Sequence, residues 1–105
     1  MKLLSIDHIP GKEIEALDIV KGTVVHTKNV GRDFMAAMKT LVGGELVGYT
    51  QMLNEARQIA VKRMVDEAEA LGADAIVNVR YGTSSVMSGA AEVIAYGTAV
   101  KILNP

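Results

Sequence analysis

The strongest pattern in the chain is a stretch from Glu45 to Leu71 in which apolar residues recur every three or four positions. This spacing places side chains on one side of an α-helix. It predicts an amphipathic helix of about seven turns, roughly 40 Å long, which ends where Gly72 follows Leu71. The apolar positions that define its predicted buried side are Tyr49, Met52, Leu53, Ala56, Ile59, Ala60, Met64, Ala68 and Leu71.

Three segments rich in β-branched residues, 14–27, 73–82 and 90–103, predict β-strands. Gly22 lies inside the first, and an interior glycine marks a bulge or a close backbone approach, so we expect the strand to bend there. The Ser and Gly residues between 83 and 89 predict a flexible loop. The last two strands then form an antiparallel hairpin.

Two shorter segments complete the pattern. Pro10-Gly11 predicts a turn near the N-terminus. Residues 29–42 predict a short helix, which begins near Asn29 and ends at Gly43-Gly44.

The order of elements predicts an α+β, two-layer fold of β-α-β-β type, in one domain over residues 1–105. We expect a three-stranded, mainly antiparallel sheet with one face on the long helix. The connection between the first two strands should be a right-handed crossover, with the last strand lying between them.

Composition narrows the class of protein. The 105 residues include 11 basic and 12 acidic ones, with a net charge of -1, which argues against a disordered chain or a nucleic-acid-binding module. The absence of cysteine excludes disulfides and thiolate metal sites. No apolar run reaches the roughly 20 residues of a membrane span or the roughly 7–15 of an export signal. We therefore expect a cytoplasmic protein.

Both faces of the predicted sheet carry apolar residues, which predicts a homo-oligomer. The last strand has Val93, Ala95, Gly97 and Ala99 on one face and Ile94, Tyr96, Val100 and Ile102 on the other. Aspartate at Ile94 and Val100 should therefore dissociate or unfold the chain. The acidic end of the helix is a solvated cluster, or is compensated by Lys21 or Lys28 of a neighbouring subunit; its residues are Asp66, Glu67 and Glu69.

Several short motifs resemble those of the YbjQ-like family of uncharacterised small bacterial proteins, which carries a heavy-metal-binding label. The resemblance runs from about residue 14 to 103 and implies a dodecin-like subunit in a ring-shaped homopentamer. It implies no established catalytic residues. The matching pieces are Gly-Arg-Asp-Phe from Gly31, Val-Gly-Gly from Val42, Tyr49, Leu53, Ala56-Arg57, Ala60, Leu-Gly-Ala-Asp-Ala from Leu71 and Tyr-Gly-Thr-Ala-Val-Lys from Tyr96.

The sequence offers little to a metal ion. A soft heavy metal prefers thiolates, and the only imidazoles, His8 and His26, are 18 positions apart without ligand-like spacing. Methionines at helical spacing are more often core residues than ligands. We therefore expect no metal site.

A second candidate is a cluster of arginines and neighbouring polar residues around the Gly43-Gly44 break. Arginines beside a helix junction could bind an anion. Alternatively, Arg57 pairs with Asp33 or Glu45 in a structural network. We prefer this hypothesis to the anion site. The candidate ligand-binding residues are Arg32, Asp33, Tyr49, Arg57, Arg80 and Tyr81.

No phosphate-binding loop, dinucleotide fingerprint, zinc-protease motif or nucleophile elbow is present. We expect no catalytic residues, no cofactor and no enzymatic activity. Asp74 should accept backbone hydrogen bonds in the helix-to-strand turn. The sequence thus predicts a homo-oligomer, by resemblance a pentamer, with a binding or scaffolding role. The alternatives are an assembly with small-ligand or anion pockets between subunits, a metal-binding protein, and an enzyme that uses the arginines.

Overall fold

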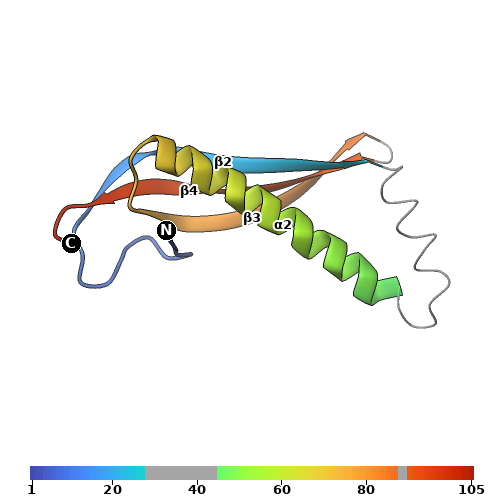
Figure 1. Ribbon diagram of the computed structural model, residues 1–105, viewed down its shortest axis with the longest axis horizontal. Coiled ribbons are helices and arrows are strands. Elements are labelled where there is room, and N and C mark those ends of the chain that lie inside the picture. The colour runs from blue at the N-terminus through green and yellow to red at the C-terminus, as the bar shows by residue number, and fades with distance from the viewer. Residues whose placement is uncertain (28–44, 88–89) are drawn as a thin grey trace.

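The computed structural model describes residues 1–27, 45–87 and 90–105, which form one long helix against one face of a sheet (Figure 1). The predicted short helix over 29–42 lies outside the described residues. Both chain ends lie at the same end of the elongated molecule, which measures 54 × 26 × 18 Å. The elements are β1 Lys2–Leu3, β2 Ile14–Thr27, α2 Glu45–Ala70, β3 Ala75–Met87 and β4 Ala90–Ile102.

The sheet has four strands in the order β1-β3-β4-β2. The predicted position of the last strand between the other two is confirmed, because β4 pairs antiparallel with both β2 and β3. The prediction of three strands is wrong: β1 adds a parallel fourth strand along β3. Two residues are too few to show a periodic pattern. The pairing continues irregularly, with Asn78 N–H donating to Ile6 O at 2.9 Å.

The predicted loop over 83–89 is wrong for most of its length. β3 continues to Met87 and pairs with the start of β4, as Thr83 with Val93 and Met87 with Ala90. The strand partner satisfies the backbone polar groups that a loop would leave to water. The sheet therefore extends as a narrow three-stranded arm at the end far from the termini (Figure 1).

Helix α2 buries Ala56, Ala60, Met64 and Ala68, a strict four-residue repeat of mostly small side chains. The predicted helix is confirmed, but two positions of its predicted buried side, Ile59 and Leu71, are exposed. Gly72 ends the helix with φ of 78°, and Ala73 N–H donates to Ala68 O at 3.1 Å. The left-handed conformation at this position favours glycine.

The helix touches the sheet directly at Gly22 of β2. A Cβ atom at Gly22 would lie 1.9 Å from the carbonyl oxygen of Ala60 and 2.5 Å from the amide nitrogen of Met64. The expected close backbone approach is therefore confirmed. The irregularity in the pairing of β2 with β4 lies instead between Ala16 and Asp18.

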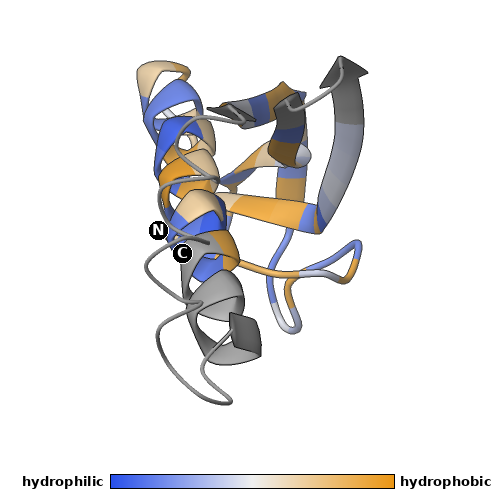
Figure 2. Ribbon diagram, turned by 90° about the vertical axis from the view of Figure 1, so that its right-hand side faces the viewer, coloured by the Kyte–Doolittle hydropathy of each residue, from blue (hydrophilic) through white to orange (hydrophobic). Residues whose placement is uncertain are grey.

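The two faces of the sheet are covered by different parts of the chain. On the helix side, Val20, Ile76 and Ala95 pack with the buried residues of α2, and Figure 2 shows the helix lying on one side of the sheet only. On the opposite side, the N-terminal segment buries Ile9 against a smaller cluster, formed with Ala75, Val77 and Val100. Val100 is thus a core residue, so aspartate there should unfold the chain rather than dissociate it.

Beyond that segment, none of the described elements covers the side of the sheet opposite α2. We call this surface the open face. Alternation along the strands places Ile19, Lys21 and Val25 of β2 on it, together with Tyr96 of β4 and Arg80 of β3. Ile19 is 71% exposed, Val25 53% and Tyr96 41%. Among the described helices, none is long and apolar enough to cross a membrane.

The contact at Gly22 generates a prediction for stability. Gly22→Ala should destabilise the protein by about 3 kcal/mol or more, because the new methyl group meets helix backbone that cannot rotate away. Chemical denaturation followed by circular dichroism measures this.

Gly82→Ala is the matched control. A Cβ at Gly82 would lie 3.2 Å from Cγ2 of Ile94, a side chain that can adjust, so its cost should stay below about 1 kcal/mol. Equal stability of Gly22→Ala and the unmodified protein would contradict the close approach.

Candidate functional site

A polar groove lies between the middle of α2 and β3. One side of the helix supplies five of its residues at positions i, i+3, i+4, i+7 and i+8, and Tyr81 of β3 supplies the sixth. The groove has a volume of about 500 Å³. It brings together two of the sequence-predicted site residues, Arg57 and Tyr81. The helical residues that line this Tyr81 groove are Asn54, Arg57, Gln58, Val61 and Lys62.

A β-bulge directs Tyr81 toward the helix. Simple alternation would place Tyr81 on the same face as Ala75 and Val77, but the register of β3 against β4 shifts between Val77 and Arg80. Asn78 adopts φ of 55° within this bulge. Tyr81 consequently pairs with Ala95, which faces α2. Asparagine tolerates this conformation better than most residues. Asn78 was therefore the feature of the sequence that could have indicated the bulge.

Arg57 does not make the predicted structural pair with Glu45. Both residues belong to α2. They are twelve positions apart, which is about 18 Å along the helix axis and beyond the reach of their side chains. Arg57 is exposed, and its Nη1 donates a hydrogen bond to Asn54 Oδ1 at 2.9 Å. The proposed partner Asp33 lies outside the described residues. Among those described, no carboxylate forms an ion pair with Arg57.

In the part of the chain that the structure describes, the other predicted site residues do not line the Tyr81 groove. Arg80 lies on the open face, where its Nη1 donates to Ser5 O at 2.7 Å and to Val79 O at 3.0 Å. It therefore holds the N-terminal segment to β3. Tyr49 belongs to α2, and its side chain is not described; Arg32 lies outside the described residues.

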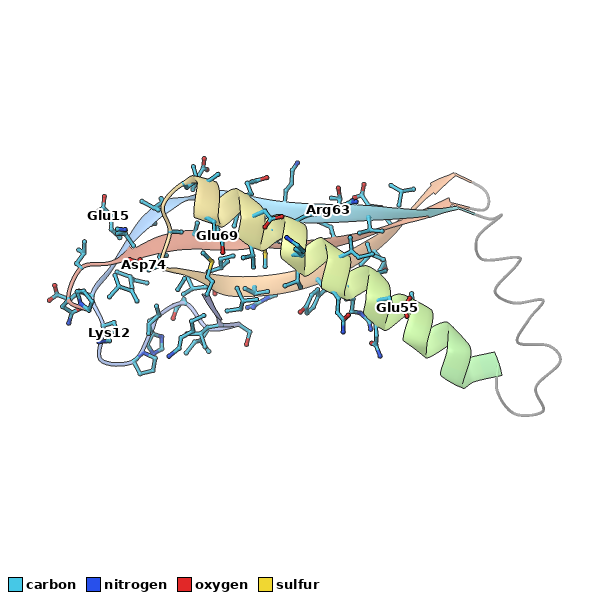
Figure 3. All side chains as sticks on the ribbon, viewed as in Figure 1. Lys12, Glu15, Glu55, Arg63, Glu69 and Asp74 are labelled. Carbon is cyan, nitrogen blue, oxygen red and sulfur yellow. The ribbon has the colours of Figure 1, made fainter. Side chains whose placement is uncertain are left out.

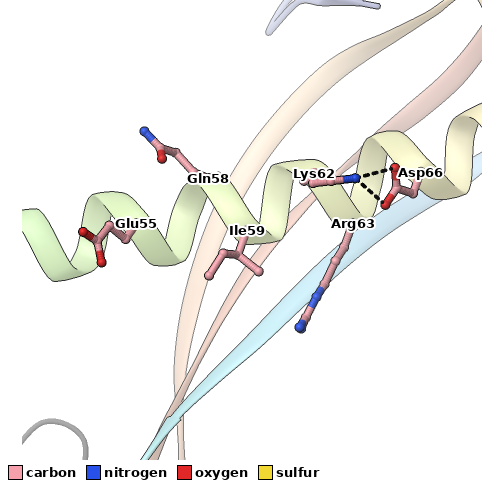
Figure 4. Close-up of a pocket in the computed structure, with 6 residues that line it drawn as sticks. All are labelled: Glu55, Gln58, Ile59, Lys62, Arg63 and Asp66. Atoms are coloured by element: carbon pink, nitrogen blue, oxygen red, sulfur yellow. Dashed lines mark hydrogen bonds and ion pairs between the residues drawn. The ribbon is translucent and has the colours of Figure 1, made fainter.

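A second hollow, of about 590 Å³, lies along the adjacent side of α2 and shares Gln58 and Lys62 with the Tyr81 groove (Figure 4). Its charges balance, and most are engaged within the protein. Lys62 Nζ lies 3.1 Å from Asp66 Oδ2, and Arg63 Nη1 donates to Thr23 O at 2.5 Å. The hollow therefore offers less to a charged ligand than the Tyr81 groove does. Its lining residues are Glu55, Gln58, Ile59, Lys62, Arg63 and Asp66.

Asp74 accepts a backbone hydrogen bond, as predicted, although the donor is a strand residue. Ile102 N–H donates to Asp74 Oδ2 at 2.8 Å, and Lys101 Nζ lies 3.7 Å from Asp74 Oδ1. The carboxylate therefore ties the start of β3 to the end of β4. Its role is structural.

Potential metal donors are sparse. In residues 1–27, 45–87 and 90–105, no three His, Cys, Asp or Glu side chains are grouped to hold an ion. His8 Nδ1 is hydrogen-bonded to Asp7 Oδ1 at 2.9 Å, and this bond and the neighbouring charge of His8 lower the pKa of the Asp7 carboxyl. Both side chains are exposed. One imidazole and one carboxylate make at most half of a four-ligand zinc site.

We predict that zinc, copper and cadmium bind no more tightly than to an ordinary surface histidine, because too few donors converge. Calorimetric titration of the unmodified protein and of the His8→Ala and His26→Ala variants measures this. One site per chain with submicromolar affinity, abolished by His26→Ala, would contradict the prediction.

Comparison with known proteins gives a family without an established activity. The YbjQ family model, described as "Putative heavy-metal-binding", matches residues 1–103. A UPF0145 protein of Clostridium novyi is 62% identical over 98% of this chain and 100% of its own length. A UPF0145 protein of Helicobacter hepaticus is 56% identical over 99% of this chain and 100% of its own.

A solved structure from Pediococcus pentosaceus, a protein of unknown function of the DUF74 family, shares the fold. Its TM-score is 0.63, at 19% identity over 97% of each chain. At this identity the similarity concerns the fold alone. The family-model match and the curated relatives extend over nearly the whole sequence. The chain belongs to the YbjQ (UPF0145) family.

Proposed function

We propose that the protein is a cytoplasmic homo-oligomer with a binding or scaffolding role, in which the open face of one copy contacts another copy. The observation that carries this proposal is the exposure of Ile19, Val25 and Tyr96 together on one sheet face. A sheet face with apolar side chains is stable in water when something covers it. A second copy is the cover that is always present.

The charges favour a head-to-tail contact. On the open face, Lys21 and Arg80 lie on either side of Tyr96, since both pair with it across the strands. A symmetric contact of this face with itself would bring these cations together. The last turns of α2 carry an excess of acidic residues that would complement them; these are Asp66, Glu67 and Glu69.

A head-to-tail contact that closes on itself makes a ring. This supports the ring-shaped pentamer and the dodecin-like arrangement that the family resemblance implies. Lys21, a predicted partner of the acidic helix end, is exposed and available for this contact. The proposal assigns no catalytic residue, nucleic acid or membrane to the protein.

The hydrogen bonds along the free edge of β2 favour an interface on the open face over one formed by strand pairing at that edge. Ile19 N–H donates to Asp18 Oδ1 at 2.7 Å, Lys21 N–H to Glu67 Oε1 at 3.4 Å, and Thr23 O accepts from Arg63. Side chains thus already occupy three of the backbone groups that another strand would need.

The proposal predicts that Ile19→Asp dissociates the assembly without unfolding the chain. The side chain is mostly exposed within one copy, so the fold tolerates a charge there, whereas an unpaired charge buried between copies should weaken association by at least about 100-fold. Sedimentation equilibrium at micromolar concentration should give a multiple of 11.2 kDa for the unmodified protein. The variant should give the single chain.

Leu103→Asp is the control, because Leu103 is exposed but lies at the C-terminal end, away from the open face. It should assemble normally. A single-chain mass for the unmodified protein, or normal assembly of Ile19→Asp, would refute the proposal.

A further inference from the structure

We infer that the Tyr81 groove binds a small planar anion, an aromatic ring that carries a carboxylate or phosphate group. This inference does not depend on the proposed self-association, because none of the described residues that line the groove belongs to the proposed interface.

The charge of the Tyr81 groove selects for an anion. None of the six described residues that line it is acidic. Lys62 is engaged with Asp66, whereas Arg57 forms no ion pair with a described residue and donates a hydrogen bond to the neutral amide of Asn54. A guanidinium has five donors in a planar fork that matches a carboxylate or phosphate. Among the described residues, this one hydrogen bond to Asn54 leaves donors for a ligand.

The neighbouring amides add donors without adding charge. Asn54 lies three positions before Arg57, and Gln58 follows Arg57 directly, four positions after Asn54, so all three line the same side of α2. Their side-chain NH₂ groups can donate to the remaining oxygens of a bound anion. This set of groups is suited to an anionic group with two or three oxygens.

The exposed aromatic ring of Tyr81 is suited to stacking with a planar ligand. It is 56% exposed, although it faces the helix side of the sheet, where its cross-strand partner Ala95 is buried. A ring stacked on Tyr81 would cover it, and half-buried Val61 would provide an apolar side wall. Nucleoside monophosphates and aromatic carboxylates combine such a ring with an anionic group.

Ligand-observed NMR titration of the full chain tests this with AMP and benzoate as probes. Adenosine and inorganic phosphate serve as the separate halves of AMP. We expect AMP, benzoate or both to bind with a dissociation constant below about 1 mM, and each half of AMP at least tenfold more weakly than AMP. Binding of AMP alone identifies a phosphate ester, and binding of benzoate alone identifies a carboxylate.

Substitutions locate the site. Arg57→Gln should weaken binding of the anionic probe about tenfold, because it removes a charged hydrogen bond, and should leave adenosine unchanged. Tyr81→Ala should weaken the anionic probe and adenosine alike. Both residues are exposed, so both variants should fold, and circular dichroism checks this.

Lys12→Gln is the matched control for loss of one positive charge. Lys12 lies at the opposite end of the molecule from Glu55, which neighbours Arg57 on α2 (Figure 3), so this variant should bind normally. Failure of both AMP and benzoate to bind at about 10 mM would overturn the inference. Equal loss in Arg57→Gln and Lys12→Gln would also overturn it. The Ile19→Asp variant should retain binding, which separates this result from the test of assembly.

Discussion

The contact between α2 and β2 at Gly22 is the constraint on which the rest of the structure depends. Without a side chain there, the helix backbone rests on the strand, and the small residues Ala60 and Ala68 continue the contact along the helix. The position brings Arg63 and Glu67 to the strand edge, where they bond Thr23 and Lys21. One close approach therefore fixes the helix and protects the exposed edge.

The same packing leaves two surfaces without a partner among the described residues. Because the only described helix covers one face, the apolar residues of the open face remain exposed beyond the N-terminal segment. On the covered side, α2 crosses the sheet diagonally (Figure 1) and leaves Tyr81 facing a polar groove. The first surface suits another copy of the chain, and the second suits a small ligand, so the proposed binding or scaffolding role has two separate physical bases.

The sequence predicted what depends on periodicity: the long helix, its glycine end, three of the strands and the central place of β4. It missed features that depend on one or two residues. β1 is too short for a pattern, and the bulge at Asn78 reverses the alternation, so it sends Tyr81 to the helix side and Arg80 to the other. For the same reason, the predicted site is divided: Arg57 and Tyr81 line the same groove, whereas Arg80 binds the N-terminal segment on the other side of the sheet.

The central claim is that another copy covers the open face, and the absence of native cysteine allows a direct test. Single Ile19→Cys and Glu69→Cys variants give thiols on the open face and near the end of α2. With a thiol reagent, modification of Ile19→Cys should slow sharply as protein concentration rises through the assembly range, because the partner excludes the reagent. A rate at position 19 that is fast and independent of concentration, while the protein sediments as an oligomer, would contradict the account. The rate at position 69 shows whether the acidic helix end is the other half of the contact.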